Sequence, residues 1–157
     1  MSSKSEQVAE FHRLIGAPVG IPIQAERGDA HVAMLLSTYS SVCKGLSMNL
    51  LHEWKRKPAQ HRLLRAHLLL EEPAECLVAL ANCKEVDLLD GLCDMEYVTI
   101  GTGVCYGLPM EAGFDEVHRS NMTKTPPEGD IRASSKGRMW QPPNLREIID
   151  RSRHESK

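Results

Sequence analysis

The sequence predicts an all-α protein, and three observations support that prediction. Apolar residues are mostly Leu, Ala, Val and Met, whereas aromatic residues make up only 4% of the chain. Apolar side chains recur at helical spacing over long stretches. No alternating apolar pattern with a tight turn indicates a β-hairpin, and no internal repeat has a fixed period. We therefore expect a helical bundle followed by an irregular C-terminal tail.

The boundaries of the expected helices follow from glycines, prolines and capping side chains. Gly16 and Pro18 end the first helix. Asp29 is expected to be the N-cap of the second helix, which ends near Gly45, and residues 46–57 form either a short helix or an ordered loop. The expected helices are residues 5–16, about 30–43, about 59–82, about 85–106, about 110–122 and about 144–153.

The length of 157 residues predicts one domain with a core of its own. We expect residues 1–124 to form this domain, with residues 24–58 as an insertion. Beyond them the composition shifts to proline, glycine, serine and charge. Residues 125–157 are therefore expected to be a C-terminal extension made of a loop and a short helix.

Charge and composition argue against several classes of function. The net charge of −2 provides no basic field for DNA or RNA. No apolar run approaches the roughly 20 residues of a membrane span, and the N-terminus lacks the apolar core of a signal peptide. The five cysteines form no Cys-x-x-Cys pair and are expected to be small buried thiols in a reducing compartment. We therefore expect a cytoplasmic protein.

Two acidic clusters lie in otherwise apolar helical sequence. Their spacing of three and four residues places the carboxylates of each cluster on one side of a helix. Crowded carboxylates on an apolar face repel one another and lose solvation unless a cation neutralises them. Oxygen ligands suit Mg²⁺, with Mn²⁺ as the alternative ion, whereas solvated acidic faces would be interleaved with more basic residues. The residues are Glu71, Glu72 and Glu75, then Asp87 and Asp90, with Asp94 one turn further on.

Pro73 lies inside the first acidic cluster. In an ordinary helix interior it costs roughly 3 kcal/mol, because it lacks an N–H group and clashes with the preceding turn. Either the helix kinks at Pro73 or a break separates Glu72 from Glu75. A kink would help the carboxylates converge on a metal ion, and the alternative is a proline tolerated where packing already distorts the helix.

The ligand types favour phosphoryl chemistry over redox chemistry. A di-iron bundle normally uses Glu-x-x-His motifs, which the acidic clusters lack. With oxygen ligands alone, Mg²⁺-dependent phosphoryl chemistry is the better prediction. The metal then neutralises phosphate oxygens while one carboxylate orients or deprotonates the attacking water.

The order Glu-Glu-x-x-Glu, spacer, Asp-x-x-Asp resembles the all-α nucleoside triphosphate pyrophosphatases. That superfamily includes MazG, the dimeric dUTPases and phosphoribosyl-ATP pyrophosphohydrolase. Asp87 stands where the family typically has Glu, which keeps the charge but shortens the reach. Residues 11–19, 90–98 and 114–124 are similar to segments of bacterial and phage MazG-like proteins. Together the similarities span residues 8–23 and about 60–145.

The resemblance implies a MazG-like helical bundle completed by oligomerisation, as a homodimer or homotetramer. It also implies cleavage of a (deoxy)nucleoside triphosphate between its α and β phosphates, giving the monophosphate and pyrophosphate in nucleotide-pool control. Glu72 would also be the catalytic base, and Asp94 would support the ligands without binding the ion. By position, the metal ligands would be Glu71, Glu72, Glu75, Asp87 and Asp90.

Seven further residues are candidates for substrate binding. Arginine and lysine suit phosphates, asparagine suits hydroxyls or base edges, and an aromatic ring can stack on a base. The alternatives are a core aromatic, a charged helix end and a tail without a role in binding. The candidates are Phe11, His12, Arg119, Asn121, Lys124, Lys136 and Arg138.

Two other functions stay open at this point. One is phosphoribosyl-ATP pyrophosphohydrolase activity on the same scaffold, although residues beyond Asn121 resemble the MazG-like group more. The other is a non-catalytic helical interaction protein, for which Pro73 and Asp87 are the supporting features. The preferred nucleobase and sugar do not follow from the sequence.

Overall fold

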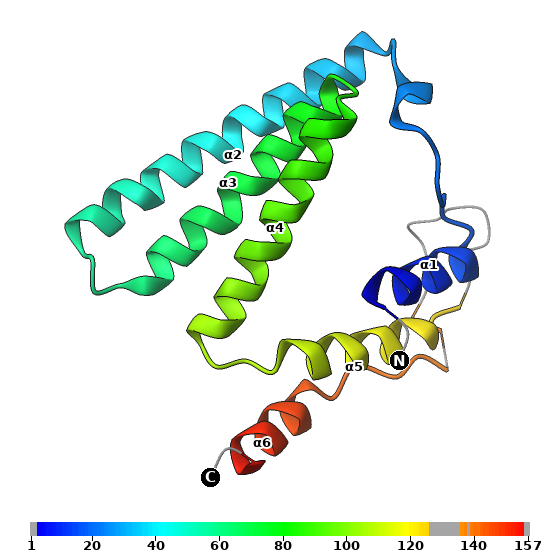
Figure 1. Ribbon diagram of the computed structural model, residues 1–157, viewed down its shortest axis with the longest axis vertical. Helices are drawn as coiled ribbons and strands as arrows, with labels where there is room; N and C mark the ends of the chain where they lie inside the picture. Colours follow the sequence, from blue (N-terminus) through cyan, green and yellow to red (C-terminus); the bar gives the residue numbers. More distant parts are fainter. Residues whose placement is uncertain (1–2, 126–135, 138, 156–157) are drawn as a thin grey trace. The chain divides into compact units, whose positions relative to one another are not determined.

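The computed structural model describes residues 3–125, 136–137 and 139–155, and these residues confirm the all-α class (Figure 1). Two compact units make up the chain, one of residues 22–106 and one of residues 1–21 with 107–157. In the described residues the elements are α1 (Lys4–Ile15), the 3₁₀ helix η1 (Ile23–Glu26), α2 (Ala30–Arg56), α3 (His61–Ala81), α4 (Glu85–Cys105), α5 (Met110–Met122) and α6 (Leu145–Glu155).

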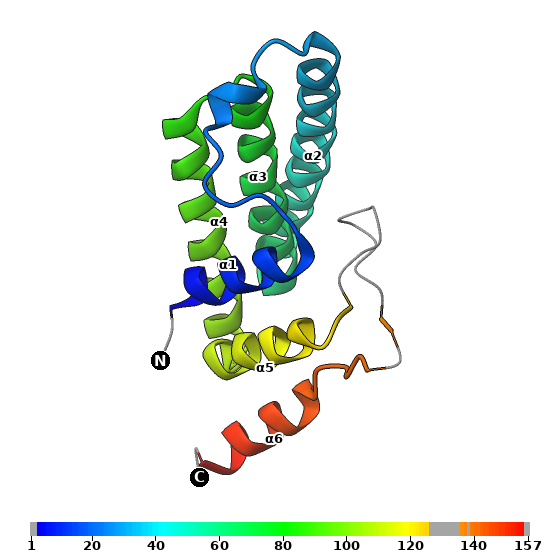
Figure 2. The same ribbon diagram turned by 90° about the vertical axis from the view of Figure 1, so that its right-hand side faces the viewer.

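In the unit of residues 22–106, α3 lies between α2 and α4 and packs against both (Figures 1 and 2). Polar groups fix the register of these antiparallel neighbours. On the α2 side, the Ser40 hydroxyl donates a 2.6 Å hydrogen bond to the main-chain oxygen of Ala74. On the α4 side, Arg65 donates to the main-chain oxygen of Val98 at 2.6 Å and to Thr102 Oγ1 at 3.0 Å. The hairpin of α3 and α4 carries both acidic clusters.

A tight turn joins α3 to α4. The N–H of Lys84 donates to the oxygen of Ala79 at 2.9 Å, and the N–H of Cys83 donates to the oxygen of Leu80 at 3.1 Å. These two bonds form a Schellman motif, which places Cys83 in the left-handed region, with φ of 48°. The turn therefore reverses the chain over very few residues and sets α3 and α4 antiparallel from this point.

A glycine allows α4 to approach α3 closely next to the acidic residues. A Cβ atom at Gly91 would lie 2.9 Å from the Sγ atom of Cys76, which is a buried side chain. Gly45 on α2 has no atom within 4 Å of the equivalent position. The absent side chain at Gly91 thus determines how near the two acidic helices come.

We expect Gly91→Val to destabilise the protein by about 1–3 kcal/mol, because the added atoms overpack the α3–α4 contact. Gly45→Ala is the matched control and should stabilise by up to about 1 kcal/mol, since alanine favours helix and nothing obstructs its methyl group. Urea unfolding of the two variants and the wild type measures both changes. Equal effects at the two glycines would contradict the close approach at Gly91.

The expectation that the second helix ends near Gly45 is wrong, because α2 continues to Arg56. Glycine costs about 1 kcal/mol in a helix interior relative to alanine. Packing on both sides of Gly45 outweighs this cost, since Ser40 and Ser47 are both buried against α3. The alternative of a break at Pro73 is also wrong, because α3 runs through this proline from His61 to Ala81.

Much apolar surface is left uncovered. Among the described residues, the buried apolar side chains are Ala74, Cys76, Ala79 and Cys83, all in the C-terminal half of α3 or in the turn that follows it. Exposed large apolar side chains line α2 and α4, and Tyr97 is 81% exposed. On α2 they are Val32, Met34, Leu35, Tyr39, Val42, Leu46 and Met48, and on α4 they include Val86, Leu89, Leu92, Tyr97, Ile100 and Val104.

The cysteines are free thiols, as expected, but only two of them are buried. Burial raises the pKa of the Cys76 thiol, and the charge of Glu72 raises it further. Cys93 and Cys105 are exposed because they lie on faces of α4 that the described neighbours do not cover. The expectation of small buried thiols therefore holds for Cys76 and Cys83 alone.

In the other unit, α1 packs against α5, and α5 contacts α6. A capping box starts α1, since Ser3 Oγ accepts from the N–H of Glu6 and the Glu6 carboxylate accepts from the N–H of Ser3. Gly16, with φ of 70°, ends this helix. Gln7 Nε2 donates to Asp115 Oδ1 at 2.9 Å and joins α1 to α5.

The helix α6 confirms the short helix that the sequence predicts near the C-terminus. The predicted division at residue 124 and the predicted insertion at residues 24–58 stay predictions. Within the described residues, no helix combines the length and apolar character needed to cross a membrane.

Candidate active site

Glu72 is the centre of the negative charge on the α3–α4 hairpin. Burial raises the pKa of its carboxyl group, and the charges of Asp94, Glu75, Glu71 and Asp90 raise it further, in that order. Glu72 is half-buried, whereas Glu75 and both aspartates are exposed. A carboxylate in such surroundings gains from a proton or a cation, because either one relieves the crowding of like charge.

The register of the hairpin explains why Asp94 has the largest of these charge effects. The chain reverses at Cys83, so residues about equally distant from it lie level. Cys76, seven residues before Cys83, contacts Gly91, eight residues after it. Glu72 lies eleven residues before this turn and Asp94 eleven residues after it. Asp87 lies seven residues before Asp94, or about 10 Å along the helix at 1.5 Å per residue.

Asp87 has different surroundings from the other acidic residues. Its Oδ2 atom lies 3.4 Å from Lys84 Nζ in an exposed ion pair. It is not among the charges that raise the pKa of Glu72. The assignment of Asp87 as a metal ligand stays a prediction, and its position along α4 favours Asp90 and Asp94 as the partners of the glutamates.

The donor chemistry of the hairpin fits a hard divalent cation. Four carboxylates surround Glu72, and the raised pKa of this residue reflects its burial and then their negative charge, which a cation would neutralise. Within the part of the chain that the structure describes, however, no three His, Cys, Asp or Glu side chains lie close enough to hold an ion together. Metal binding therefore requires carboxylate side chains to rotate toward a common point, and the ligand set stays a prediction.

Glu71 has a histidine as its neighbour. His67 Nε2 lies 3.6 Å from Glu71 Oε2, one turn earlier on α3. On its other side, His67 Nδ1 lies 2.6 Å from Ser47 Oγ of α2. The first two glutamates of the cluster thus differ in their surroundings, since Glu71 contacts a histidine held by α2 and Glu72 is influenced by the aspartates of α4.

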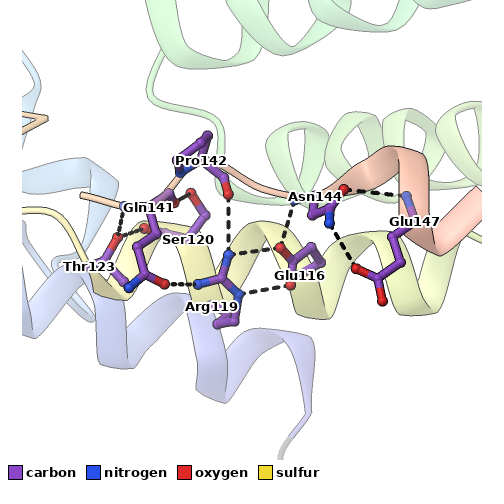
Figure 3. A network of polar contacts seen from close by, with 8 residues as sticks. All are labelled: Glu116, Arg119, Ser120, Thr123, Gln141, Pro142, Asn144 and Glu147. Atoms are coloured by element: carbon purple, nitrogen blue, oxygen red, sulfur yellow. Dashed lines mark hydrogen bonds and ion pairs between the residues drawn. The ribbon is translucent and has the colours of Figure 1, made fainter. Parts of the chain in front are cut away.

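In the other unit, Arg119 binds the segment that leads into α6 (Figure 3). Its guanidinium donates to both oxygens of Glu116 at 2.8 Å, to Gln141 Oε1 at 2.9 Å and to the main-chain oxygen of Pro142 at 3.2 Å. Glu116 Oε1 also accepts from the N–H of Asn144 at 2.7 Å. The N–H groups of Arg119 therefore bind acceptors within the protein. Contact of Arg119 with a substrate stays a prediction.

The pKa of Glu116 is lowered to about 2, chiefly by the hydrogen bonds from Arg119 and then by the N–H of Asn144. Because its pKa is lowered, the ionised Glu116 carboxylate stabilises the folded contact at pH values above 4.5, which is its ordinary pKa. This contribution is lost as the pH falls toward 2. We expect α6 to loosen from α5 over that range. Heteronuclear NOE values of residues 145–155 at several pH values measure the change.

Two variants test the origin of this pH dependence. Glu116→Gln should loosen α6 already at neutral pH and remove the pH dependence, because glutamine keeps the shape but not the charge. Glu111→Gln on the same helix is the matched control, since Glu111 pairs with Lys4 and not with the tail. A loosening of equal size in the control would contradict the role of Glu116.

The other candidates for substrate binding have contacts within their own unit or lie outside the described residues. His12 Nδ1 lies 3.0 Å from the main-chain oxygen of Pro18. The Nζ atom of Lys124 lies 5.5 Å from the ring centre of Phe11, and that of Lys136 lies 4.5 Å from the ring centre of Trp140. Asn121 is half-buried, and Arg138 lies outside the described residues. Their role in binding a substrate stays a prediction.

Sequence reasoning missed His67 and Ser47. The spacing of four residues between His67 and Glu71 was an available signal, because such residues are neighbours on a helix. Ser47 had no such signal, since the second helix was expected to end before it. No sequence pattern singled out Gly91, because its importance depends on the contact with Cys76.

Residues 50–121, which are 72 of the 157 residues, match the family model described as phosphoribosyl-ATP pyrophosphohydrolase (PRA-PH). The match runs from the last turns of α2 almost to the end of α5 and includes both acidic clusters. The chain thus contains a PRA-PH family domain. This family is part of the MazG-like all-α NTP pyrophosphatase superfamily, so the resemblance predicted from the acidic motifs is confirmed.

The PRA-PH domain indicates a pyrophosphohydrolase of nucleotide-like substrates. Of the predicted insertion, residues 50–58 lie inside the matched segment and residues 24–49 lie outside it. No curated protein and no solved structure matches the chain significantly.

Proposed function

We propose that this PRA-PH domain protein is a metal-dependent nucleoside triphosphate pyrophosphohydrolase that acts in nucleotide-pool control in the cytoplasm. The substrate is a ribo- or deoxyribonucleoside triphosphate, and the products are the monophosphate and pyrophosphate. The observation that supports this proposal is the crowding of carboxylates around Glu72, whose pKa is raised by burial and by four neighbouring charges. The PRA-PH family match covers all of these residues.

Glu72 is the proposed catalytic base. A raised pKa makes its carboxylate a stronger proton acceptor, because less is lost when the group becomes neutral. In the proposed reaction, Glu72 takes a proton from the attacking water, whose oxygen forms the new bond to phosphorus as pyrophosphate leaves. The proton on Glu72 then returns to solvent, so the carboxylate is ready for another turnover.

We propose that Mg²⁺ or Mn²⁺ is held by Glu71, Glu72, Glu75, Asp90 and Asp94, with Asp87 in a peripheral role. The ion, when bound, would neutralise phosphate oxygens and the charge that develops on the leaving pyrophosphate. The exposed side chains of Glu75 and the two aspartates leave room for the phosphates to approach.

A second candidate substrate is phosphoribosyl-ATP itself, because the matching family model carries that name. This compound contains the same kind of triphosphate, so the same carboxylates would serve the same bond cleavage. Similarity of residues 114–124 to MazG-like proteins favours the nucleoside triphosphates.

Pyrophosphate release from a panel of ribo- and deoxyribonucleoside triphosphates and phosphoribosyl-ATP tests the proposal. We expect release that requires Mg²⁺ or Mn²⁺, stops on chelation and favours one nucleobase. Preference for phosphoribosyl-ATP over every nucleoside triphosphate would select the second candidate. Absence of pyrophosphate from the whole panel, without any rise in melting temperature on addition of metal, would favour a non-catalytic helical protein.

We also propose that the protein is a homo-oligomer in which copies cover the apolar faces of α2 and α4. Exposed apolar side chains recur along both helices, and an isologous dimer would bury the same surface on both copies. We expect light scattering to give a mass of two or four times 17.5 kDa. Tyr39→Glu and Leu89→Glu should each lower that mass, and a wild-type mass of one chain would contradict the proposal.

A further inference from the structure

A half-buried arginine of α3 carries a positive charge that no carboxylate among the described residues neutralises. Arg65 donates from Nε to Thr102 Oγ1 at 3.0 Å and from Nη2 to the main-chain oxygen of Val98 at 2.6 Å. Both acceptors are uncharged, and Arg65 forms no ion pair in the part of the chain that the structure describes. We propose that Arg65 binds the two terminal phosphates of the substrate, which leave as pyrophosphate. This inference rests on the proposed function, because it needs a triphosphate substrate.

The helix α4 fixes the guanidinium group in place. A Cβ atom at Gly101 would lie 3.1 Å from Arg65 Nη2 and 3.8 Å from Arg65 Nη1, so a side chain there would crowd the guanidinium. Glycine is unfavourable in a helix interior, yet here it leaves room for the charged group. The hydroxyl of Thr102 donates to the main-chain oxygen of Val98 at 2.8 Å, so its lone pairs are free to accept from Arg65 Nε. The guanidinium is therefore held by contacts that orient it without neutralising it.

A purely structural role would not account for this arrangement. The main-chain oxygen of Val98 stays hydrogen-bonded without Arg65, because the hydroxyl of Thr102 also donates to it. A guanidinium has five N–H groups, and Arg65 uses two of them within the described residues. Partial removal of a charge from water costs free energy unless an opposite charge compensates it. Phosphate supplies this charge together with several acceptor oxygens that suit a guanidinium.

The position of Arg65 relative to Glu72 fits the phosphates that leave. The two residues are seven apart on α3, so they share one side of the helix about 10 Å apart at 1.5 Å per residue. Asp94, Val98 and Thr102 follow one another at intervals of four on α4, so they also share one side of that helix. With the first phosphate next to Glu72, the second and third phosphates would extend along α3 toward the guanidinium.

The sequence of the α3–α4 hairpin leaves Arg65 as the favoured cation for this role. Residues 61–105 contain three Lys or Arg residues, which are Arg62, Arg65 and Lys84. Lys84 Nζ lies 3.4 Å from Asp87 Oδ2, so its charge is already paired. Arg62 is exposed and donates to Gln60 Oε1 at 3.1 Å. It is ten residues before Glu72, so it projects from a different side of α3.

Pyrophosphate affinity of the full chain tests the inference, because pyrophosphate is the part of the substrate that Arg65 would hold. Phosphorus-31 NMR titration at pH 7 in EDTA measures this affinity for the wild type, Arg65→Gln and Arg62→Gln. Arg62→Gln is the matched control, since it removes the same charge from the same helix. We expect Arg65→Gln to weaken pyrophosphate binding about tenfold or more, which is typical of a lost hydrogen bond to a charged group. Arg62→Gln should stay within about threefold of the wild type, because salt screens an exposed charge.

A third variant separates charge from packing. Thr102→Val removes one acceptor of Arg65 but keeps the guanidinium. We expect Arg65→Gln and Thr102→Val both to melt below the wild type, whereas Arg65→Gln alone should lose pyrophosphate affinity tenfold or more. A merely structural role gives a loss of affinity that follows the melting temperature in both variants. An equal loss in Arg65→Gln and Thr102→Val would overturn the inference, as would an equal loss in the Arg62→Gln control or a wild type that binds no pyrophosphate.

The panel of triphosphates on the same proteins separates this inference from the proposed function. A wild type that hydrolyses a nucleoside triphosphate, with equal pyrophosphate affinity in all variants, would keep the function and overturn the role of Arg65. The expected order of pyrophosphate affinities in a protein that hydrolyses no triphosphate would support the phosphate site at Arg65 and reject the function.

Discussion

Glu72→Gln is expected to lower kcat for pyrophosphate release by about 10²–10⁴-fold, which is the contribution typical of a general base. Glutamine keeps the size of the side chain and one oxygen, but it cannot accept the proton of the attacking water. The wild type and the variant are compared at saturating substrate and metal, so that weaker binding does not account for the loss. A variant that keeps more than a tenth of the wild-type kcat would exclude Glu72 as the base.

The same variant is also expected to affect stability. In the metal-free protein at neutral pH, the substitution that lowers activity should not lower the melting temperature. The pKa of Glu72 is raised in the folded protein from its ordinary value of 4.5, so its stabilising contribution is complete below 4.5 and is lost as the pH rises through the folded value. At neutral pH the ionised carboxylate therefore destabilises the metal-free fold. We expect metal-free Glu72→Gln to melt at or above the temperature of the wild type at neutral pH, with no such gain below pH 4.5.

These opposite effects distinguish loss of chemistry from loss of structure. A misfolded variant would lose activity and melt at a lower temperature, whereas Glu72→Gln should lose activity without a lower melting temperature. Addition of Mg²⁺ should then stabilise the wild type more than the variant, because the wild type has one more negative charge to neutralise.

The helices of this protein follow from local sequence patterns, and the close contacts between them do not. The ends of α1 and α5 could be predicted because Gly16 and Pro109 lie at them, and these residues determine backbone geometry locally. The continuation of α2 through Gly45 could not be predicted this way, because the stabilisation comes from α3, a helix remote in sequence. The contact of Gly91 with Cys76 is of the same kind.

The acidic residues of the site could be predicted, but not which of them lie together. The pattern of Glu71, Glu72 and Glu75 on one helix and of Asp90 on the next indicates a site without any knowledge of the turn. Which aspartate faces Glu72 depends on where the chain reverses, and the Schellman turn at Cys83 places Asp94 level with it. Counting residues from the predicted helix ends would have favoured Asp94 over Asp87.

Asp94→Asn is accordingly expected to lower kcat/KM by about 10²-fold, whereas Asp87→Asn should change it less than about threefold. Of the neighbouring charges, Asp94 has the largest effect on the pKa of Glu72. Its replacement by asparagine also removes a proposed metal ligand next to the base. Asp87 lies about 10 Å further along α4, which is about one Debye length at 0.1 M salt. Both variants remove one charge from one helix, so they form a matched pair.

A measurement on the metal-free protein separates the two aspartates without reference to activity. Because the charge of Asp94 raises the pKa of Glu72, Asp94→Asn should shift the titration of the Glu72 carboxyl to lower pH. Asp87→Asn should leave that titration unchanged, because Asp87 is not among the charges that act on Glu72. Carbon-13 NMR of the glutamate side chains follows it directly. A larger shift in Asp87→Asn than in Asp94→Asn would mean that the two helices pair in a different register, and Asp87 would then become the favoured partner of Glu72.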